Sequence, residues 1–125
     1  MANGTILVVD DSPTQQKLIC APFEAQGYEV HAVGDGSEAL AAIQVDNHFD
    51  LVIMDVVMPK MNGFQACKKI RKLRQDLPII LLSTKDQTSD AYWAIHQGAN
   101  LYMTKPFDSQ ELFDNAVKLM AGGQP

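Results

Sequence analysis

Short apolar runs alternate with amphipathic stretches five times along this 125-residue chain. The runs predict five β-strands, at Thr5–Val9, Glu29–Ala32, Leu51–Met54, Ile79–Leu82 and Leu101–Met103. The first, third and fourth runs consist of apolar or β-branched residues throughout, which is typical of parallel strands buried on both faces. Helical spacing between the runs predicts an α/β fold, a doubly wound parallel sheet with helices on both faces.

Residues that favour helix ends support this alternation. Ser12 predicts a helix N-cap, Pro13 suits the first helical position, and Gln15 completes a capping-box pattern. Gly27 and Gly98 follow helical stretches, where a left-handed residue commonly ends the helix. We expect one domain over residues 1–125, with a folded core of about residues 4–121 and a frayed tail.

Pro22 lies inside the first helical stretch, Pro13–Gln26. Proline lacks the N–H that would bond the Leu18 carbonyl, and its ring crowds that turn, at a cost of about 3 kcal/mol. We predict that this helix kinks or breaks between Leu18 and Pro22.

Composition narrows the class of protein. Ten basic against fifteen acidic residues give a net charge of -5, which argues against binding nucleic acid through a basic surface. No apolar run approaches the roughly 20 residues that cross a bilayer. Cys20 and Cys67 lie far apart without metal-ligand spacing, so we expect neither a disulfide framework nor a zinc site. These features favour a cytoplasmic protein, and we also expect a monomer.

Polar residues follow the predicted strands. The carboxyl ends of parallel strands meet at one edge of the sheet, where open α/β folds bind ligands. Six polar residues are expected there: Asp10, Asp11, Asp55, Ser83, Thr84 and Lys105. Three ionised carboxylates repel one another, so their pKa values rise or a cation binds, and oxygen ligands suit Mg²⁺. Together with a lysine and a hydroxyl, this set is suited to phosphoryl transfer, in which an aspartate can accept the group.

Each of these residues also has a purely structural explanation. Asp10 and Asp11 precede a helix, where carboxylates cap backbone N–H groups and complement the helix dipole. Asp55 is compatible with a turn at a strand end, Ser83 and Thr84 with the start of a loop, and Lys105 with a solvated site before a proline. The phosphoryl-transfer hypothesis therefore depends on their joint placement.

Four segments resemble the receiver domain of two-component response regulators: VVDDS, MDVVMPKMNG, LLST and YMTKPF. The resemblance covers nearly the whole chain, and the motifs occur in the family's order. It implies a five-stranded, flavodoxin-like sheet with strand order 2-1-3-4-5 and five helices. It also implies that Asp55 accepts a phosphoryl group from a phosphohistidine of a histidine kinase.

The same resemblance implies a Mg²⁺ site. Asp11, Asp55 and the backbone carbonyl of Val57 would hold the ion, and Asp10 would act mostly through water.

Further roles follow from the resemblance around the phosphoryl group. Ser83 would donate a hydrogen bond to a phosphoryl oxygen, Lys105 would pair with the group, and Tyr102 matches the aromatic switch position. Thr84 departs from the alanine that many members carry, which implies a different access to the phosphoryl group and a different lifetime.

A narrower resemblance concerns the helix surfaces. The segments NGFQACKKI and STKDQTSDAYWAIHQGA are similar to receivers of type IV pilus twitching-motility or phototaxis systems. This implies a chemotaxis-type histidine kinase with a phosphotransfer domain as one partner, and a downstream protein target as another. No nucleic-acid or membrane partner is expected.

Two other functions remain open at this stage. The segment from Gly34 to Ala39 fits a dinucleotide-binding glycine pattern, but Asp35 and Glu38 place negative charge where a pyrophosphate would lie. A cap at Asp35 or Ser37 explains the segment equally well. A Mg²⁺-dependent phosphatase with an aspartyl nucleophile, similar to the haloacid dehalogenase class, is the second alternative, although that class spaces its acids as Asp-x-Asp.

Three further features have no role in these hypotheses. His31, His48 and His96 lack metal-site spacing and are expected at the surface or half-buried. The run Lys68–Lys72 is expected to be the solvated face of an amphipathic helix. Tyr92 and Trp93 fit either a helix core or a partner-binding face.

Overall fold

The computed structural model describes residues 3–46 and 48–123. Five parallel strands form one sheet in the order β2-β1-β3-β4-β5, as expected. The strands are β1 (Thr5–Val9), β2 (Glu29–Val33), β3 (Leu51–Asp55), β4 (Ile79–Ser83) and β5 (Leu101–Thr104). The helices between and after them are α1 (Pro13–Ala25), α2 (Gly36–Val45), α3 (Gly63–Leu73), α4 (Thr88–His96) and α5 (Ser109–Met120).

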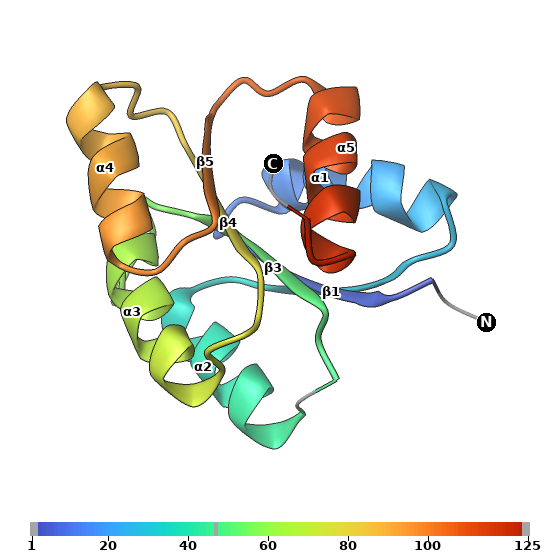
Figure 1. Ribbon diagram of the computed structural model, residues 1–125, viewed down its shortest axis with the longest axis horizontal. Helices are drawn as coiled ribbons and strands as arrows, with labels where there is room; N and C mark the ends of the chain where they lie inside the picture. Colours follow the sequence, from blue (N-terminus) through green and yellow to red (C-terminus); the bar gives the residue numbers. More distant parts are fainter. Residues whose placement is uncertain (1–2, 47, 124–125) are drawn as a thin grey trace.

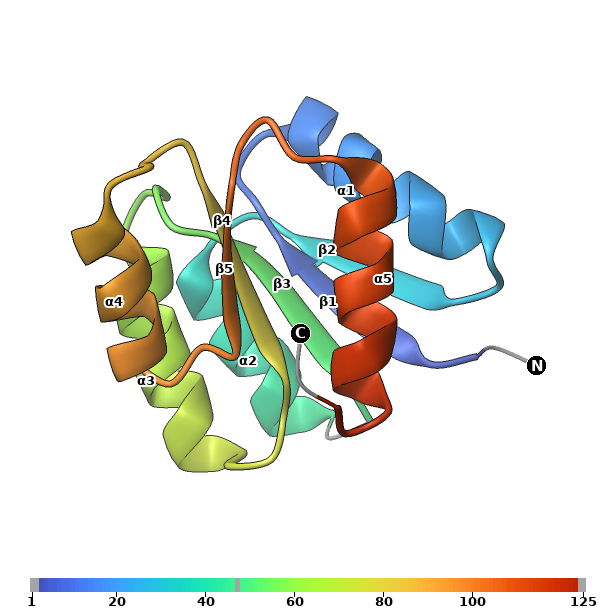
Figure 2. The same cartoon turned by 45° about the horizontal axis from the view of Figure 1, so that its top comes forward.

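Helices cover both faces of the sheet, with α1 and α5 on one side and α2, α3 and α4 on the other (Figures 1 and 2). Successive strand residues point to opposite faces, so each central strand supplies two cores. In β1, Leu7 and Val9 contact the α2–α4 side, whereas Ile6 and Val8 contact α1 and α5. This explains why β1, β3 and β4 are apolar at almost every position.

Four strands extend one residue beyond their apolar runs, to Val33, Asp55, Ser83 and Thr104. Pairing with a neighbouring strand continues to these last residues, because Asp55 is in register with Leu82, and Ser83 with Thr104. The polar side chains of Asp55 and Ser83 are therefore attached to the rigid ends of strands rather than to loops.

The start of α1 follows the expected pattern with one change. The Ser12 hydroxyl accepts the Gln15 N–H at 3.3 Å, and Pro13 occupies the first helical turn. The Ser12 N–H donates to the Asp10 carboxylate at 2.9 Å instead of to Gln15, so the expected capping box is wrong. A carboxylate is the stronger acceptor, and it lies two residues away.

The break expected at Pro22 is absent, because α1 continues through this residue to Ala25, whereas the kink expected between Leu18 and Pro22 stays a prediction. Pro22 cannot donate the helical hydrogen bond to the Leu18 carbonyl. The Leu18 side chain is exposed, so this side of the helix faces solvent. On the buried side, Ile19 and Phe23 pack against the sheet. The apolar face therefore stabilises the helix more than the proline destabilises it.

Side chains cap the starts of three further helices, and glycines follow the ends of two. Asp35, Asn62 and Asp108 accept backbone N–H bonds at the starts of α2, α3 and α5. Gly27 and Gly98 adopt φ values of 86° and 106°, so the expected left-handed glycines are confirmed.

The lysine-rich run is only partly a solvated face. Its lysines are exposed, but Ile70 is buried, and the Arg71 guanidinium lies between α3 and the following loops. The guanidinium donates to five acceptors, the carbonyls of Arg74, Gln75, Leu77 and Gly98 and the side chain of Asn100, at 2.7–3.1 Å. The expectation is therefore wrong for Arg71, because carbonyls at the end of α3 need donors that a fork-shaped guanidinium supplies.

Two groups of side chains match expectation. His31, His48 and His96 are exposed, and Cys20 and Cys67 are buried free thiols. Among the described residues, no helix combines the length and apolar character needed to span a membrane.

We predict that the Cys67 thiol makes stability fall at alkaline pH. Burial raises its pKa to about 11 from 9.0 against the opposing charge of Arg71. The thiol ionises at a lower pH in the unfolded chain than in the folded protein. Its contribution to the free energy of unfolding is therefore complete below about pH 9 and declines by about 2 kcal/mol as the pH rises to about 11. Urea unfolding of wild type and Cys67→Ala over this range measures the effect. Equal pH slopes for the two proteins would contradict it.

Candidate functional site

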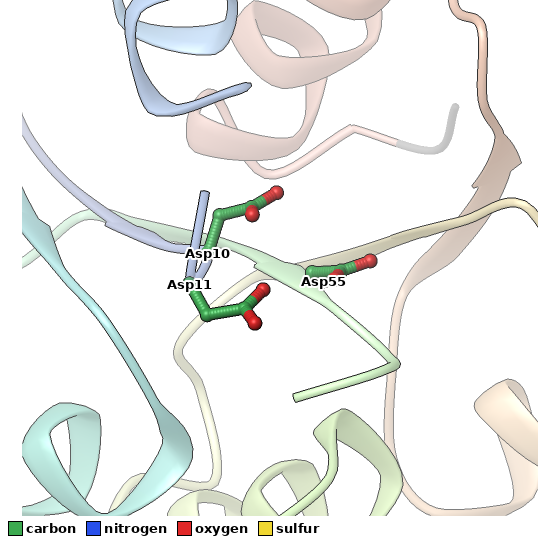
Figure 3. A group of neighbouring side chains, drawn as sticks. All are labelled: Asp10, Asp11 and Asp55. Carbon is green, nitrogen blue, oxygen red and sulfur yellow. The ribbon is translucent and has the colours of Figure 1, made fainter. Parts of the chain in front are cut away.

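Three carboxylates meet at the carboxyl edge of the sheet. Asp10 and Asp11 follow β1, and Asp55 ends β3 (Figure 3). One oxygen of each lies within 4.8 Å of the others. Asp10 is 1% exposed and Asp55 is 8% exposed, whereas Asp11 faces solvent. The expected convergence of these residues is therefore present.

Lys105 brings positive charge to the carboxylates. Its Nζ lies 2.8 Å from Asp10 Oδ2 and 3.3 Å from Asp55 Oδ1. The Lys105 backbone N–H donates to the Ser83 carbonyl at 2.7 Å, so the end of β4 positions the lysine backbone. Lys105 is joined to Pro106 by a cis peptide bond. The cation is thus held in a buried ion pair rather than solvated.

The cluster contains more negative than positive charge. Burial and the neighbouring Asp10 carboxylate raise the pKa of Asp55, although Lys105 acts in the opposite direction. One lysine faces three carboxylates, so the site retains excess negative charge when all are ionised.

The donor set fits a hard divalent cation. The three carboxylates offer oxygens close together, and the exposed side chain of Asp11 leaves the cluster open to water. Mg²⁺ prefers a few carboxylates and several water molecules over a closed protein cage. The described residues thus include a suitable place for Mg²⁺ beside Asp55.

Ser83 and Tyr102 lie on adjacent strands beside the carboxylates. Ser83 is fully buried, and its hydroxyl accepts the Lys85 N–H at 3.1 Å. The half-buried Tyr102 donates its hydroxyl to the Lys85 carbonyl at 2.6 Å, and burial raises its pKa. The β4–α4 loop therefore contacts both side chains. Thr84 is exposed at the start of this loop.

The loop after β3 contains Val57, whose backbone carbonyl the family resemblance assigns to the Mg²⁺ site, and Lys60, which the sequence reasoning did not single out. Val57, the second residue after β3, is 56% exposed. Lys60 has a φ of 67°, and the Met61 N–H donates to the Pro59 carbonyl across it at 2.7 Å. Gly63 then starts α3, and its N–H donates to the Val56 carbonyl at 2.8 Å. The asparagine–glycine pair at the N-cap and first residue of α3 was the available indication of a turn in this region.

Gln16 is a second residue near the site that the sequence patterns did not indicate. Its side-chain amide donates to the carbonyls of Asp10 and Val33 at 2.7 and 3.1 Å. It therefore holds the loop carrying Asp10 and Asp11 against the end of β2. A glutamine in a helix has no sequence pattern that indicates such a role.

The glycine-rich segment before α2 forms a helix cap. The Asp35 carboxylate accepts the Glu38 N–H at 2.9 Å and the Ser37 hydroxyl at 2.7 Å. The Gly34 N–H donates to the Glu38 side chain at 2.8 Å. Carboxylates of the chain itself thus occupy donors that a pyrophosphate would need, which argues against a dinucleotide site.

Comparison with known proteins agrees with this geometry. Residues 6–117 match the family described as the response regulator receiver domain. The chain is 39% identical over 119 residues to the PilH protein of Pseudomonas aeruginosa, covering 94% of this chain and 98% of PilH. It is 38% identical over 110 residues to the Bacillus subtilis alkaline phosphatase synthesis transcriptional regulatory protein PhoP, covering 88% of this chain but 45% of PhoP.

A solved structure shows the same fold. The Francisella response regulator 1452 receiver domain superposes with a TM-score of 0.90 at 32% identity, covering 96% of this chain and 98% of that domain. The strand order, the acidic edge and the sequence match thus agree. The chain belongs to the response regulator receiver domain family of two-component systems.

Proposed function

We propose that Asp55 accepts a phosphoryl group from a phosphohistidine of a histidine kinase. The observation that carries this proposal is the cluster at the sheet edge in which Lys105 Nζ lies 3.3 Å from Asp55 Oδ1 and the carboxylates of Asp10 and Asp11 lie alongside. Asp55 is fixed at the end of a central strand, whereas Asp11 is open to solvent and a donor can approach.

In the proposed step, a carboxylate oxygen of Asp55 forms a bond to phosphorus. The bond between phosphorus and the histidine nitrogen breaks, and the imidazole keeps that electron pair and takes up a proton from solvent. Lys105 neutralises charge on the phosphoryl oxygens, and the Ser83 hydroxyl donates a hydrogen bond to one of them. Asp11, Asp55 and the Val57 carbonyl would hold Mg²⁺, with Asp10 acting mostly through water. When bound, Mg²⁺ supplies neutralisation of negative charge on the transferring group.

The signal is proposed to leave through the surface of α4, β5 and α5. A cavity of about 460 Å³ lies there, with Tyr102 in its lining between helix residues such as Ala91 and Glu111. If Ser83 turns toward a phosphoryl oxygen, its bond with the Lys85 N–H is lost. The Lys85 carbonyl that holds Tyr102 then moves too, and the ring and cavity change shape.

The proposed partners are a chemotaxis-type histidine kinase with a phosphotransfer domain and a downstream protein target. The match to the response regulator receiver domain family supports a histidine kinase and a downstream target as partners. Resemblance of the α3 and α4 segments to motility receivers supports a role in motility control.

Phosphorylation by a small donor tests the proposal. The protein is incubated with acetyl phosphate, with Mg²⁺ or with excess chelator, and examined by intact mass and peptide mapping. We expect one phosphoryl group, on Asp55, only when Mg²⁺ is present. Phosphorylation elsewhere, or equal incorporation with the chelator, would contradict the assignment.

The aspartyl phosphatase alternative predicts a different result. Such an enzyme would hydrolyse p-nitrophenyl phosphate with many turnovers, whereas a receiver loses only the group bound to its own aspartate. Steady turnover that requires Asp55 would favour the phosphatase.

A further inference from the structure

Two sequence features without a role in the proposed function lie together. The end of α3 and the end of α4 lie side by side near the loops that precede β4 and β5 (Figures 1 and 2), where Arg71 donates to the carbonyls of Leu77 and Gly98. The lysine-rich run belongs to this part of α3, and Tyr92 and Trp93 belong to α4. This is the end of the sheet opposite the aspartates, because parallel strands begin there.

A groove of about 410 Å³ separates the ends of the two helices, and we call it the α3–α4 groove. Its lining residues are Lys68, Arg71, Lys72, Gln75, His96, Gln97 and Gly98. None of these described residues is acidic. Within residues 3–46 and 48–123, Lys68 and Lys72 form no ion pair. The groove is therefore a basic site on an acidic protein.

Two exposed aromatic rings contact His96, which is one of the groove's lining residues. Tyr92 is 66% exposed and Trp93 is 51% exposed. The His96 ring stacks on Tyr92 with centroids 5.9 Å apart and meets Trp93 edge-on at 5.5 Å. The sequence left a core or a partner face open for these rings, and their exposure excludes the core. Tyrosine and tryptophan are enriched in binding hot spots.

The floor of the groove is rigid. The Arg71 guanidinium donates to the Gly98 carbonyl at 2.7 and 3.1 Å, and the Cys67 thiol lies 3.6 Å from the Gln97 carbonyl. A Cβ on Gly98 would approach Arg71 Cγ to 3.1 Å. These contacts hold the ends of α3 and α4 at a fixed separation without a ligand, so little ordering cost remains for binding.

Helix dipoles explain some of the basic residues at the ends of α3 and α4. Lys72 and His96 lie in the last turns of α3 and α4, where cations are favourable. That effect requires neither Lys68 nor two exposed rings beside the cations.

We propose that the α3–α4 groove binds an acidic peptide segment of a partner protein, with an aromatic side chain of the peptide against Trp93 and Tyr92. Carboxylates of the segment pair with Lys68 and Lys72. Charge selects this occupant, because two unpaired lysines suit a short acidic segment. A nucleic acid would instead require many phosphate contacts on a chain of net charge -5. The proposal does not depend on phosphorylation of Asp55.

An NMR titration tests the proposal. The probe is a short peptide with glutamates on both sides of one phenylalanine, added to ¹⁵N-labelled full chain at low salt. We expect saturable amide shifts confined to residues 68–75 and 92–98, and weaker binding when salt is raised to about 0.5 M. A matched peptide with glutamine in place of glutamate is expected not to bind, and one with alanine in place of phenylalanine to bind more weakly.

Variants identify the contacts. Lys72→Ala is expected to weaken binding roughly twofold to fivefold, and Trp93→Ala about tenfold. The control Lys17→Ala removes an exposed lysine of α1 and should leave affinity unchanged. Each variant is first compared with wild type by thermal unfolding, and an unchanged Tm shows that the fold is intact.

Four outcomes would overturn the proposal. They are no shifts in the groove, equal binding of the glutamine peptide, the same shifts with inorganic phosphate alone, and self-association through Lys72 that excludes the peptide. The last would assign the groove to a second copy of this chain. Phosphorylation of Asp55 is measured separately, so failure here leaves the proposed function untouched.

Discussion

Asp55→Asn is expected to abolish phosphoryl incorporation from acetyl phosphate and, without divalent cations, to raise the thermal stability of the protein. The amide removes the nucleophilic oxygen. It also removes one of three neighbouring carboxylates, two of which, Asp10 and Asp55, share Lys105. The amide oxygen of the asparagine can still accept a hydrogen bond from Lys105 Nζ, which lies 3.3 Å from Asp55 Oδ1 in the wild type. We expect a rise in Tm of several degrees, on the order of 1 kcal/mol for a domain of this size.

The direction of the Asp55 pKa shift fixes the pH dependence of this gain. Its pKa is raised in the folded protein above 3.8, so the folded state binds the proton more tightly than the unfolded chain. The destabilisation by ionised Asp55 is therefore complete above its folded pKa and disappears as the pH falls to 3.8. The Tm difference between Asp55→Asn and wild type should be large near pH 7 and vanish below about pH 4.

Added Mg²⁺ provides the second control. It should stabilise wild type more than Asp55→Asn, since the cation relieves the same repulsion. A gain that persists at low pH, or equal Mg²⁺ stabilisation of both proteins, would assign the effect to packing. Phosphorylation of Asp55→Asn at the wild-type rate would refute Asp55 as the acceptor.

The strands and the acidic edge were predictable because few physical constraints determine them. A strand buried on both faces must be apolar at nearly every position, so β1, β3 and β4 are visible as unbroken runs. Polar residues at the ends of such runs must lie at one edge of a parallel sheet. This is why Asp10, Asp55 and Ser83 could be placed together, although their roles came from family resemblance and stay predictions.

Features that depend on contacts distant in sequence were not predictable. The break at Pro22 was expected from a local cost, but packing of Phe23 against the sheet outweighs it. Arg71 was grouped with its lysine neighbours because its acceptors include the Gly98 carbonyl and the Asn100 side chain, 27 and 29 residues away. Loop conformation around Lys60 likewise depends on how α3 packs after β3.

Gly63→Ala is expected to be among the most destabilising single-methyl changes in the chain. A Cβ at this position would lie 2.4 Å from the Asp55 carbonyl oxygen and 2.8 Å from Val56 Cα. Both are backbone atoms at the end of a central strand, so neither can move away cheaply. Overpacking of this kind costs about 1–3 kcal/mol, and we expect the upper end of that range.

The matched control is Gly34→Ala, the same substitution in another strand-to-helix loop. There the nearest atom to an added Cβ is Glu38 Oε1 at 3.0 Å, the far end of a flexible side chain. Urea unfolding should show a large loss for Gly63→Ala and a small one for Gly34→Ala. The two losses would be similar if α3 could shift to accommodate the methyl group. Relief of the clash displaces the Asp55 backbone. Gly63→Ala should therefore also lower phosphorylation by acetyl phosphate under conditions where the variant is fully folded. Gly34→Ala should leave phosphorylation unchanged.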